Sequence, residues 1–470
     1  MAYDILIANG RVVSPEETRV ADVAIGGGRI AEVAPHLPRD GAGRIFDAAG
    51  KLVIPGGIDV HTHLDMPLGK IRSSDDFETG TRAAAFGGTT TIIDFANQSR
   101  GQSLHQAVAE WKSRAAGNAV IDYGLHCTIC DLSPAVLEEL DELVREGVSS
   151  FKVFMAYPGR LMLNDAAILQ VLQRCARNGG LVCVHAEDGP AVEALIREAL
   201  AAGHTAPKYH ALTRPATVEA AATARVIALA EMASAPLYVV HVTCRQSLEC
   251  VAAARARSLP VFAETCPHYL FLSRDDLDRP GFEGAKFVLT PPLREKDDQQ
   301  ALWEGLRTGV LQAVSTDHCP FNYHGQKDRG RNDFTLIPNG GPGIEHRLGL
   351  LYSGGVAAGR ISENRFVELA STAPARIFGM YPRKGVIAPG SDADIVIFDP
   401  SAERIISAQT HHMRVDYSMY EGLKVRGVPQ VVIARGQVIV ENDAFLGHAG
   451  AGEFLKRDVC SIAVTSQSQG

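Results

Sequence analysis

Short segments of alternating apolar and polar residues at both ends of the chain enclose a long region in which strand-like and helix-like runs alternate. Residues 1–53 hold the segments YDILIANGRVV, DVAIGGGRIAEV and RIFDAAGKLV, separated by Asn-Gly and Gly-rich turns, a pattern typical of β-hairpins. Segments of the same kind, DADIVIFDP and QVVIARGQVIVEN, return near the other end. We therefore predict one small β-sandwich built from both termini, residues 1–53 and 381–445.

Between these ends, residues 54–380 alternate strand-like runs with helix-like runs such as LSPAVLEELDELVREG and TVEAAATARVIALAEMA, which predicts a parallel sheet covered by helices. Eight strand-like runs follow one another: GGIDVHTH, TTTIIDFA, VIDYGLHCTI, SSFKVFMAY, LVCVHAE, PLYVVHVT, PVFAETCPHYL and VLQAVSTDH. Eight such strands form a (β/α)8 TIM-like barrel, so the predicted fold class is α/β. Residues 446–470 form a small, polar tail, which we expect to be disordered or to contact a neighbouring subunit.

Residues that can bind metal ions close five of these runs. His61 and His63 are two residues apart at the end of the first run, and the period of two along a strand places both side chains on one face, where they can share a cation. The other candidates close later runs: Lys152, His185, His241 and Asp317. Because active sites of β/α barrels lie at the C-terminal ends of the strands, this series predicts an active site there.

Each candidate also has a purely structural interpretation. A single His-x-His pair is often incidental, one buried histidine is more often a hydrogen-bonded core residue than a ligand, and Asp317 is compatible with the cap of a helix that begins near His318. Lys152 differs, because lysine is almost never fully buried unless it is paired, yet it stands between Phe151 and Val153. The ordered series at successive strand ends favours a two-metal hydrolase over these interpretations.

Composition restricts the class of protein without indicating a chemistry. The 470 residues, 46% hydrophobic and 21% charged, suffice for one large domain and a smaller one. A net charge of −8 argues against nucleic acid or an anionic membrane as the main partner. The nine cysteines show no disulfide or zinc-ribbon framework, and no run has signal-peptide features or transmembrane length. We expect a soluble, cytoplasmic protein.

The candidate ligands indicate a reaction type. A protonated lysine repels metal ions, but a desolvated lysine near two cations favours its neutral amine, which can take up carbon dioxide to form a carbamate. The carbamate of Lys152 would bridge two metals about 3.5–4 Å apart. The remaining ligands divide into His61, His63 and Asp317 for one metal, and His185 and His241 for the other. Nitrogen and oxygen ligands suit Zn²⁺, although Mn²⁺ or Co²⁺ also fit. A bridging hydroxide would attack, and Asp317 would pass its proton to a leaving nitrogen.

One series of motifs runs through nearly the whole chain: HTHLDMP, SSFKVFMAY, VHAE, VHVT, AETCPHYL, TPPLR, STDHCPF, PNGGPGIEHRL and DYSMYEG. The series resembles the dihydropyrimidinase and D-hydantoinase family of the amidohydrolase superfamily. The resemblance implies a distorted barrel with a flanking β-sandwich, two zinc ions on the six ligands above, and a carboxylated Lys152. It also implies opening of cyclic ureides: dihydrouracil to N-carbamoyl-β-alanine, or 5-substituted hydantoins to N-carbamoyl amino acids. A homotetramer is expected, with DYSMYEG and the tail as contact regions.

The resemblance further implies three residues that bind substrate. The family's substrate-binding tyrosine falls on Tyr157 in FMAYPG, and its polar substrate contacts fall on Thr290 and Asn339. A phenol beside the metals can donate a hydrogen bond to the oxyanion of the tetrahedral intermediate. Thr290 stands where many members have serine, a change that matters little if backbone atoms make the contact. Without the resemblance, all three fit ordinary half-buried or turn residues.

Two loops are expected to cover the site. Residues 318–343 are Gly-rich, charged and too long for a plain connector, and residues 64–76 directly follow the first ligand pair. The apolar residues expected to shape a pocket for a ring substituent are Leu64, Met66, Phe154 and Leu161.

Related functions remain alternatives on sequence grounds. Dihydroorotase and allantoinase share the ligand series, but their anionic or more polar substrates usually go with an arginine just after His-x-His, where this chain has Leu-Asp-Met-Pro. A non-enzymatic scaffold relative would be expected to lack metal ligands, whereas all six are present. The choice between dihydrouracil and hydantoin, the preferred enantiomer and the metal stay open.

Overall fold

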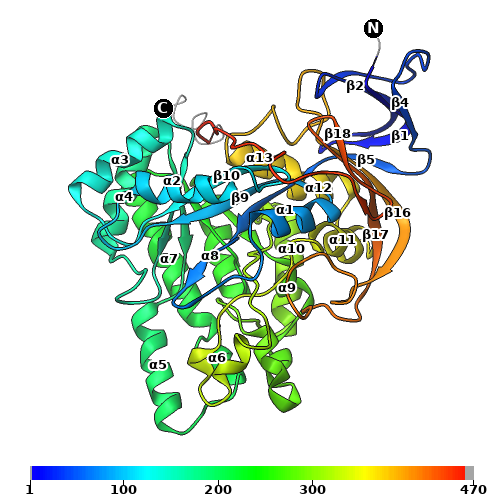
Figure 1. Cartoon of the computed structure of the whole chain (residues 1–470). Helices are drawn as coiled ribbons and strands as arrows, with labels where there is room; N and C mark the ends of the chain where they lie inside the picture. The colour runs from blue at the N-terminus through cyan, green and yellow to red at the C-terminus, as the bar shows by residue number, and fades with distance from the viewer. Residues whose placement is uncertain (1–2, 461–470) are drawn as a thin grey trace.

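Two β-sheets organise the protein, whose computed structural model describes residues 3–460 (Figure 1). The larger part is a barrel of eight parallel strands in the spatial order β15-β14-β13-β12-β11-β10-β9-β6. Its strands are β6 (Gly57–Thr62), β9 (Thr89–Asn97), β10 (Asp122–Thr128), β11 (Ser150–Phe154), β12 (Leu181–His185), β13 (Leu237–Val239), β14 (Val261–Thr265) and β15 (Ala313–Val314). These strands lie in the eight predicted runs, and the (β/α)8 TIM-like barrel is confirmed.

The barrel closes through single contacts between its first and last strands rather than through a full ladder. Thr62 and His318 form an isolated parallel bridge, and His63 N donates a hydrogen bond to His318 O at 2.8 Å. In the same seam, Thr316 Oγ1 donates to Asp59 Oδ2 at 2.6 Å. This seam places the first pair of predicted ligands beside the last one.

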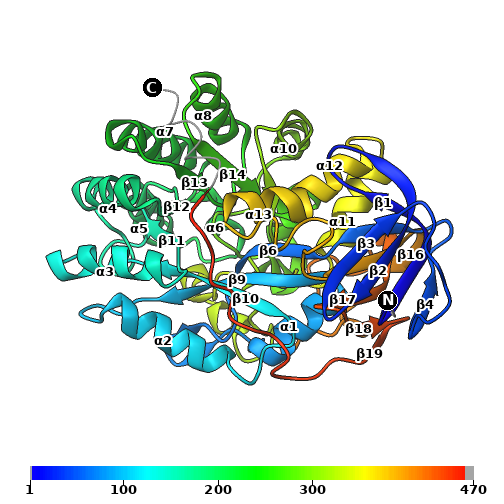
Figure 2. The same cartoon turned by 90° about the horizontal axis from the view of Figure 1, so that it is seen from above.

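Helices lie around the barrel strands, as the view from above shows (Figure 2). The longer ones are α1 (Phe77–Phe86), α2 (Leu104–Ala115), α3 (Pro134–Arg145), α4 (Asp165–Asn178), α5 (Gly189–Ala201), α7 (Ala216–Ala233), α8 (Arg245–Ala256) and α10 (Lys296–Thr308). The shorter ones are α6 (Lys208–Leu212), α9 (Pro267–Phe271), α11 (Arg347–Leu351), α12 (Glu363–Val367) and α13 (Ala373–Ile377). Short 3-10 or π segments lie at Arg274–Asp278, Pro280–Phe287, Lys327–Gly330, Phe334–Leu336, Tyr352–Ala357 and Glu368–Thr372.

Helix α4 illustrates how the sequence sets these elements. The Asn164 side chain accepts a hydrogen bond from the backbone at the first turn, and Gly179 ends the helix in the left-handed conformation. Ile168, Leu172 and Cys175, spaced by three or four residues, form its buried face. Within residues 3–460, none of the helices combines the length and the apolar character that a membrane crossing requires.

The second sheet is built from both ends of the chain, as predicted. Its strands are β1 (Ile5–Val13), β2 (Thr18–Gly26), β3 (Arg29–Ala34), β4 (Arg44–Asp47), β5 (Leu52–Pro55), β16 (Ile395–Ile405), β17 (Lys424–Ala434), β18 (Gln437–Glu441) and β19 (Ala444–Phe445). β5 pairs antiparallel with β16 and so joins the two halves. Ile7 and Val23 from one half and Ile395 and Ile433 from the other are fully buried in one shared core, beside the barrel (Figure 1).

The C-terminal tail packs against its own barrel as far as the structure describes it. Tyr123 N donates a hydrogen bond to Glu453 O at 3.0 Å, and the buried Arg457 guanidinium donates to Leu125 O at 2.7 Å. The described part of the tail therefore has defined partners within the chain, whereas its composition predicts either disorder or a contact with a neighbouring subunit. Residues 461–470 lie outside the described residues.

The segment DYSMYEG, expected as a subunit contact, is largely internal. Tyr417, Met419 and Tyr420 are each 2–3% exposed, and a Cβ on Gly341, at the edge of the barrel seam, would collide with Met419. These three side chains therefore pack within the chain and are not available to a second subunit.

Candidate active site

One cavity of about 420 Å³ lies at the C-terminal end of the barrel strands. Its lining contains all nine residues predicted as metal ligands or polar substrate contacts: His61, His63, Lys152, Tyr157, His185, His241, Thr290, Asp317 and Asn339. Residues that are up to 278 positions apart thus share one site, because parallel barrel strands bring their C-terminal ends together.

The first group of candidate ligands meets at the barrel seam. Asp317 Oδ1 lies 3.2 Å from His61 Nε2 and 3.1 Å from His63 Nε2. One ligand atom from each of the three residues lies within 4.8 Å of the other two, so these residues can hold a single metal ion. This is the grouping that the sequence predicted for one metal.

The second group lies beside the first. His185 Nδ1 and His241 Nε2 face each other at 2.9 Å, and the ring centroids of His61 and His241 are 5.5 Å apart. Among the described residues, the buried Nδ1 atoms of His63 and His241 have no hydrogen-bond partner. Buried imidazoles whose nitrogens converge on one space are the donor set that divalent metals bind, so the residues present fit metal binding.

Two glutamates that sequence reasoning missed stand behind these histidines. Glu264 Oε1 lies 2.5 Å from His61 Nδ1, and Glu187 Oε2 lies 2.8 Å from His185 Nε2. A carboxylate on the far nitrogen of a metal-ligating histidine fixes its tautomer and its orientation. The motifs VHAE and AETC carried this signal: Glu187 follows His185 by two positions, and Glu264 lies near the end of the seventh strand.

The electrostatics keep the candidate ligands in their metal-binding forms. Burial lowers the pKa of His61 and holds the pKa of His241 well below its ordinary value, so both imidazoles are neutral near pH 7. Burial alone would raise the pKa of Asp317, but the adjacent imidazoles of His61 and His63 outweigh it and keep this pKa far below its usual range. Asp317 is therefore a carboxylate.

Three site residues have a backbone conformation that is rare outside glycine. The φ angles of Tyr157, His241 and Asp317 are 63°, 39° and 47°. Such conformations cost free energy and persist only where the surrounding structure determines them, which is common at functional sites.

Lys152 lies in the middle of β11 rather than at its end, and its side chain still lines the cavity. The residue is 1% exposed, with its Nζ 5.0 Å from the ring centroid of Phe95 and 5.1 Å from that of Phe154. Burial lowers the pKa of Lys152 to about 8, against the opposing effect of Asp317. The burial of Lys152 and its lowered pKa both favour the neutral amine that carbamate formation requires.

The three predicted substrate residues lie together in the wall of the cavity. The ring of Tyr157 is 5.7 Å from that of His185, centroid to centroid. Burial raises the pKa of the Tyr157 phenol, the Glu187 carboxylate raises it further, and hydrogen bonds with Thr290 and Asn339 lower it. The phenol is thus a neutral donor held between the two polar residues that the resemblance indicated.

A buried lysine joins the segments that carry these two polar residues. Lys327 is 0% exposed, and its Nζ donates hydrogen bonds to Val288 O and Pro338 O, both at 2.9 Å. Val288 precedes Thr290 by two residues, and Pro338 directly precedes Asn339. Lys327 therefore ties the long loop to the segment after the seventh strand.

Both predicted loops form walls of the cavity. The first contains a small hairpin, β7 (Pro67–Leu68) and β8 (Ile71–Arg72), and contributes Met66, Leu68, Lys70 and Ile71 to the lining. The second contributes Cys319, Arg329 and the run 335–340. Phe154 and Leu161 also line the cavity, as expected. Leu64 does not: it is fully buried in the barrel core, where it packs against Gly80.

A (β/α)8 barrel that presents four histidines, a buried lysine and an aspartate around one cavity defines a metal-dependent hydrolase. Comparison with known proteins agrees: residues 52–439 match the model of the Amidohydrolase family. A D-hydantoinase of Streptomyces coelicolor is 51% identical over 464 residues, 98% of this chain and 99% of that protein. A D-hydantoinase of Ralstonia pickettii is 52% identical over 454 residues, 97% and 99% of the two chains.

Solved structures agree as well. The crystal structure of a dihydropyrimidinase from Brevibacillus agri has a TM-score of 0.95 to this chain at 52% identity, covering 97% of this chain and 98% of that one. The chain therefore belongs to the amidohydrolase family, in the group of hydantoinases and dihydropyrimidinases, and it is a hydrolase of cyclic amides.

Proposed function

We propose that this enzyme hydrolyses the ring amide of cyclic ureides, converting 5-substituted hydantoins to N-carbamoyl amino acids and 5,6-dihydropyrimidines to N-carbamoyl-β-amino acids. The observation that carries the proposal is one cavity in which the metal-binding group of His61, His63 and Asp317 faces Tyr157, Thr290 and Asn339. The similarity to proteins named D-hydantoinase and dihydropyrimidinase supports the same substrates.

The proposed cofactors are two divalent metal ions, most simply Zn²⁺, because the ligands are nitrogens and oxygens without thiolate. One ion would be held by His61, His63 and Asp317. The other ion would be held by His185 and His241, and a carbamate on Lys152 would bind both ions. The convergence of the His61 and His63 Nε2 atoms on Asp317, the facing nitrogens of His185 and His241, and the burial of Lys152 support this assignment. When bound, the metals would activate the attacking water and polarise the ring carbonyl.

The chain's own residues would supply binding and proton transfer. Asp317 would accept a proton at its carboxylate and return it to the leaving ring nitrogen. The Tyr157 hydroxyl would donate a hydrogen bond to the carbonyl oxygen as that oxygen gains charge. Thr290 and Asn339, beside the phenol, would orient the N–H and C=O groups of the ureide, and the apolar wall with Phe154 would receive the ring substituent.

A comparison of rates on dihydrouracil, hydantoin, both enantiomers of 5-phenylhydantoin and dihydroorotate tests the proposal. We expect uncharged ureides to be opened much faster than dihydroorotate, because Leu64, Asp65 and Met66 directly follow His63, with no arginine beside the first two ligands to neutralise a carboxylate. Comparable efficiency on dihydroorotate would contradict the proposed substrate class and favour a dihydroorotase. The ratio of the rates on the two enantiomers of 5-phenylhydantoin gives the stereochemical preference of the enzyme.

We also propose a homotetramer that works in the cytoplasm. The resemblance to the family supports the tetramer, and the buried side chains of Tyr417, Met419 and Tyr420 leave only the exposed residues of that segment, such as Asp416 and Glu421, to a contact there. The scattered, mostly buried cysteines support a reducing compartment. Sedimentation of the purified protein as a monomer would overturn the tetramer.

A further inference from the structure

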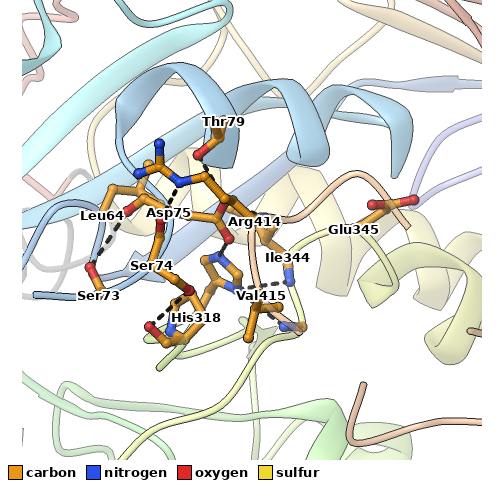
Figure 3. Close-up of polar contacts among 12 residues, drawn as sticks. Leu64, Ser73, Ser74, Asp75, Thr79, His318, Ile344, Glu345, Arg414 and Val415 are labelled. Carbon is orange, nitrogen blue, oxygen red and sulfur yellow. Dashed lines mark hydrogen bonds and ion pairs between the residues drawn. The ribbon is translucent and has the colours of Figure 1, made fainter. Parts of the chain in front are cut away.

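The backbone at Asp317 is held from both sides. Its φ of 47° is strained for a residue with a side chain, so neighbouring contacts must stabilise it. On one side, Thr316 N donates to Asp59 Oδ1 at 3.1 Å and Thr316 Oγ1 donates to Asp59 Oδ2 at 2.6 Å. On the other side stands His318, and its contacts are shown in Figure 3.

The tautomer of His318 follows from its partners. The ring is fully buried, and its Nδ1 accepts hydrogen bonds from Gly343 N at 3.1 Å and Ile344 N at 3.4 Å. Because Nδ1 accepts, Nε2 carries the proton and donates it to Asp75 Oδ2 at 3.1 Å. The backbone of His318 also accepts from His63 N at 2.8 Å, so the position of this residue affects two candidate ligands.

Asp75 joins three stretches that are distant in sequence. Its carboxylate is fully buried, and besides His318 it accepts hydrogen bonds from Arg414 N and Thr79 Oγ1, both at 2.8 Å and both on Oδ1. Figure 3 shows the carboxylate between the His318 ring, the start of α1 and the Arg414 segment. A charged acceptor with three short donors is a rigid anchor.

We propose that Asp75 is a positioning residue: through His318 it holds Asp317 in the strained conformation that turns its carboxylate toward His61 and His63. Asp75 lines no part of the cavity, so it acts through the ligand and touches no substrate. The part of this inference that concerns catalysis rests on the proposed function, and the part that concerns metal binding does not.

The test compares Asp75→Asn with Asp76→Asn as the matched control. In Asp75→Asn, the new side-chain oxygen can still accept from Arg414 N, but the new amide group would face the Nε2–H of His318, donor against donor. Asp76 caps α1 through Thr79 N at 2.9 Å and pairs with Arg414 at 3.0 Å without touching His318, and asparagine is also a good cap.

We expect zinc-loaded Asp75→Asn to release zinc to a chelator faster than wild type and to lose kcat with little change in KM, each effect about 10–100-fold, as for other partners of metal ligands. Asp76→Asn should behave like wild type in both assays. Equal behaviour of the two variants would overturn the proposal. If wild type opens no cyclic ureide, the proposed function fails, and the zinc-release comparison still decides the role of Asp75.

A second variant separates positioning from a general loss of stability. His318→Asn keeps a side-chain oxygen for the amides of Gly343 and Ile344 but removes the contact with Asp75. If the two residues act as a unit, the double variant should be no worse than either single one in zinc release and in kcat. If the effects of the two single variants on zinc release and kcat multiply in the double variant, the residues have independent roles and the proposal is overturned. If Asp75→Asn does not fold, His318→Asn alone tests the proposal: wild-type zinc release and kcat in that variant would overturn it.

Discussion

Replacing Lys327 by methionine should change how the stability of this enzyme depends on pH. The ammonium of Lys327 is 0% exposed, donates to two backbone carbonyls, and has no carboxylate partner among the described residues. Burial lowers its pKa from the ordinary 10.5 to about 7, with only the neighbouring Cys319 acting in the opposite direction. In the unfolded chain the same lysine keeps its proton up to about pH 10.

Between pH 7 and pH 10.5 the unfolded chain therefore binds more protons at this site than the folded one, and this residue makes wild type more stable as pH rises. One pKa unit corresponds to about 1.4 kcal/mol, so the free energy of unfolding should gain about 3 kcal/mol from Lys327 between pH 6 and pH 9. For a chain of 470 residues, with an unfolding entropy of about 2 cal/mol/K per residue, this is about 3 °C in Tm.

The assay is the Tm of metal-loaded wild type and Lys327→Met from pH 6 to pH 9 at one scan rate. The Tm of the variant minus that of wild type should fall by about 3 °C over this range, because methionine lacks the titrating group. Lys70→Met, which removes an exposed lysine, is the matched control and should show a flat difference. If the Tm difference between Lys327→Met and wild type also stays constant from pH 6 to pH 9, burial does not lower the pKa of Lys327 as argued.

Two further substitutions test the assigned roles in the site. Lys152→Ala should bind substantially less than two metals per subunit and lose activity, with partial rescue by short carboxylic acids that replace the bridge; full metal content and normal turnover would exclude the carbamate. Asp317→Asn keeps one ligating oxygen but cannot take up a proton near pH 7, so it should retain most of its metal in elemental analysis while kcat falls at least about 100-fold. Activity that survives with the metal intact would leave Asp317 as a ligand alone.

The sequence alone predicts the barrel and a series of candidate ligands because both depend on local pattern. An apolar run of strand length that closes with a polar residue is visible within about ten positions, and parallel strands bring such ends together. His61, His185 and Asp317 follow from this rule. Lys152 obeys it less well, since it lies inside β11, and it was found because its residue type is unusual between apolar neighbours.

Partners that meet only in the folded chain were not predictable in this way. Glu264 and His61 are 203 positions apart, and Asp75 and His318 are 243 apart. No spacing rule connects them, because the contact depends on how the strands are ordered around the barrel. The contacts of the described part of the tail are likewise not visible in its composition: the buried Arg457 donates hydrogen bonds to the backbone carbonyls of Phe378 and Leu125.

These long-range partners connect the parts of the site where the seam has no continuous strand ladder. Glu264 accepts a hydrogen bond from Tyr238 OH at 2.9 Å while it contacts the His61 ring, and it also accepts from His241 N at 3.3 Å. One buried carboxylate thus fixes a candidate ligand of each proposed metal ion. Removing it would leave Tyr238 without its acceptor and both histidines less constrained. The geometry of the two proposed metal positions is therefore coupled through the protein, independently of any ligand they share.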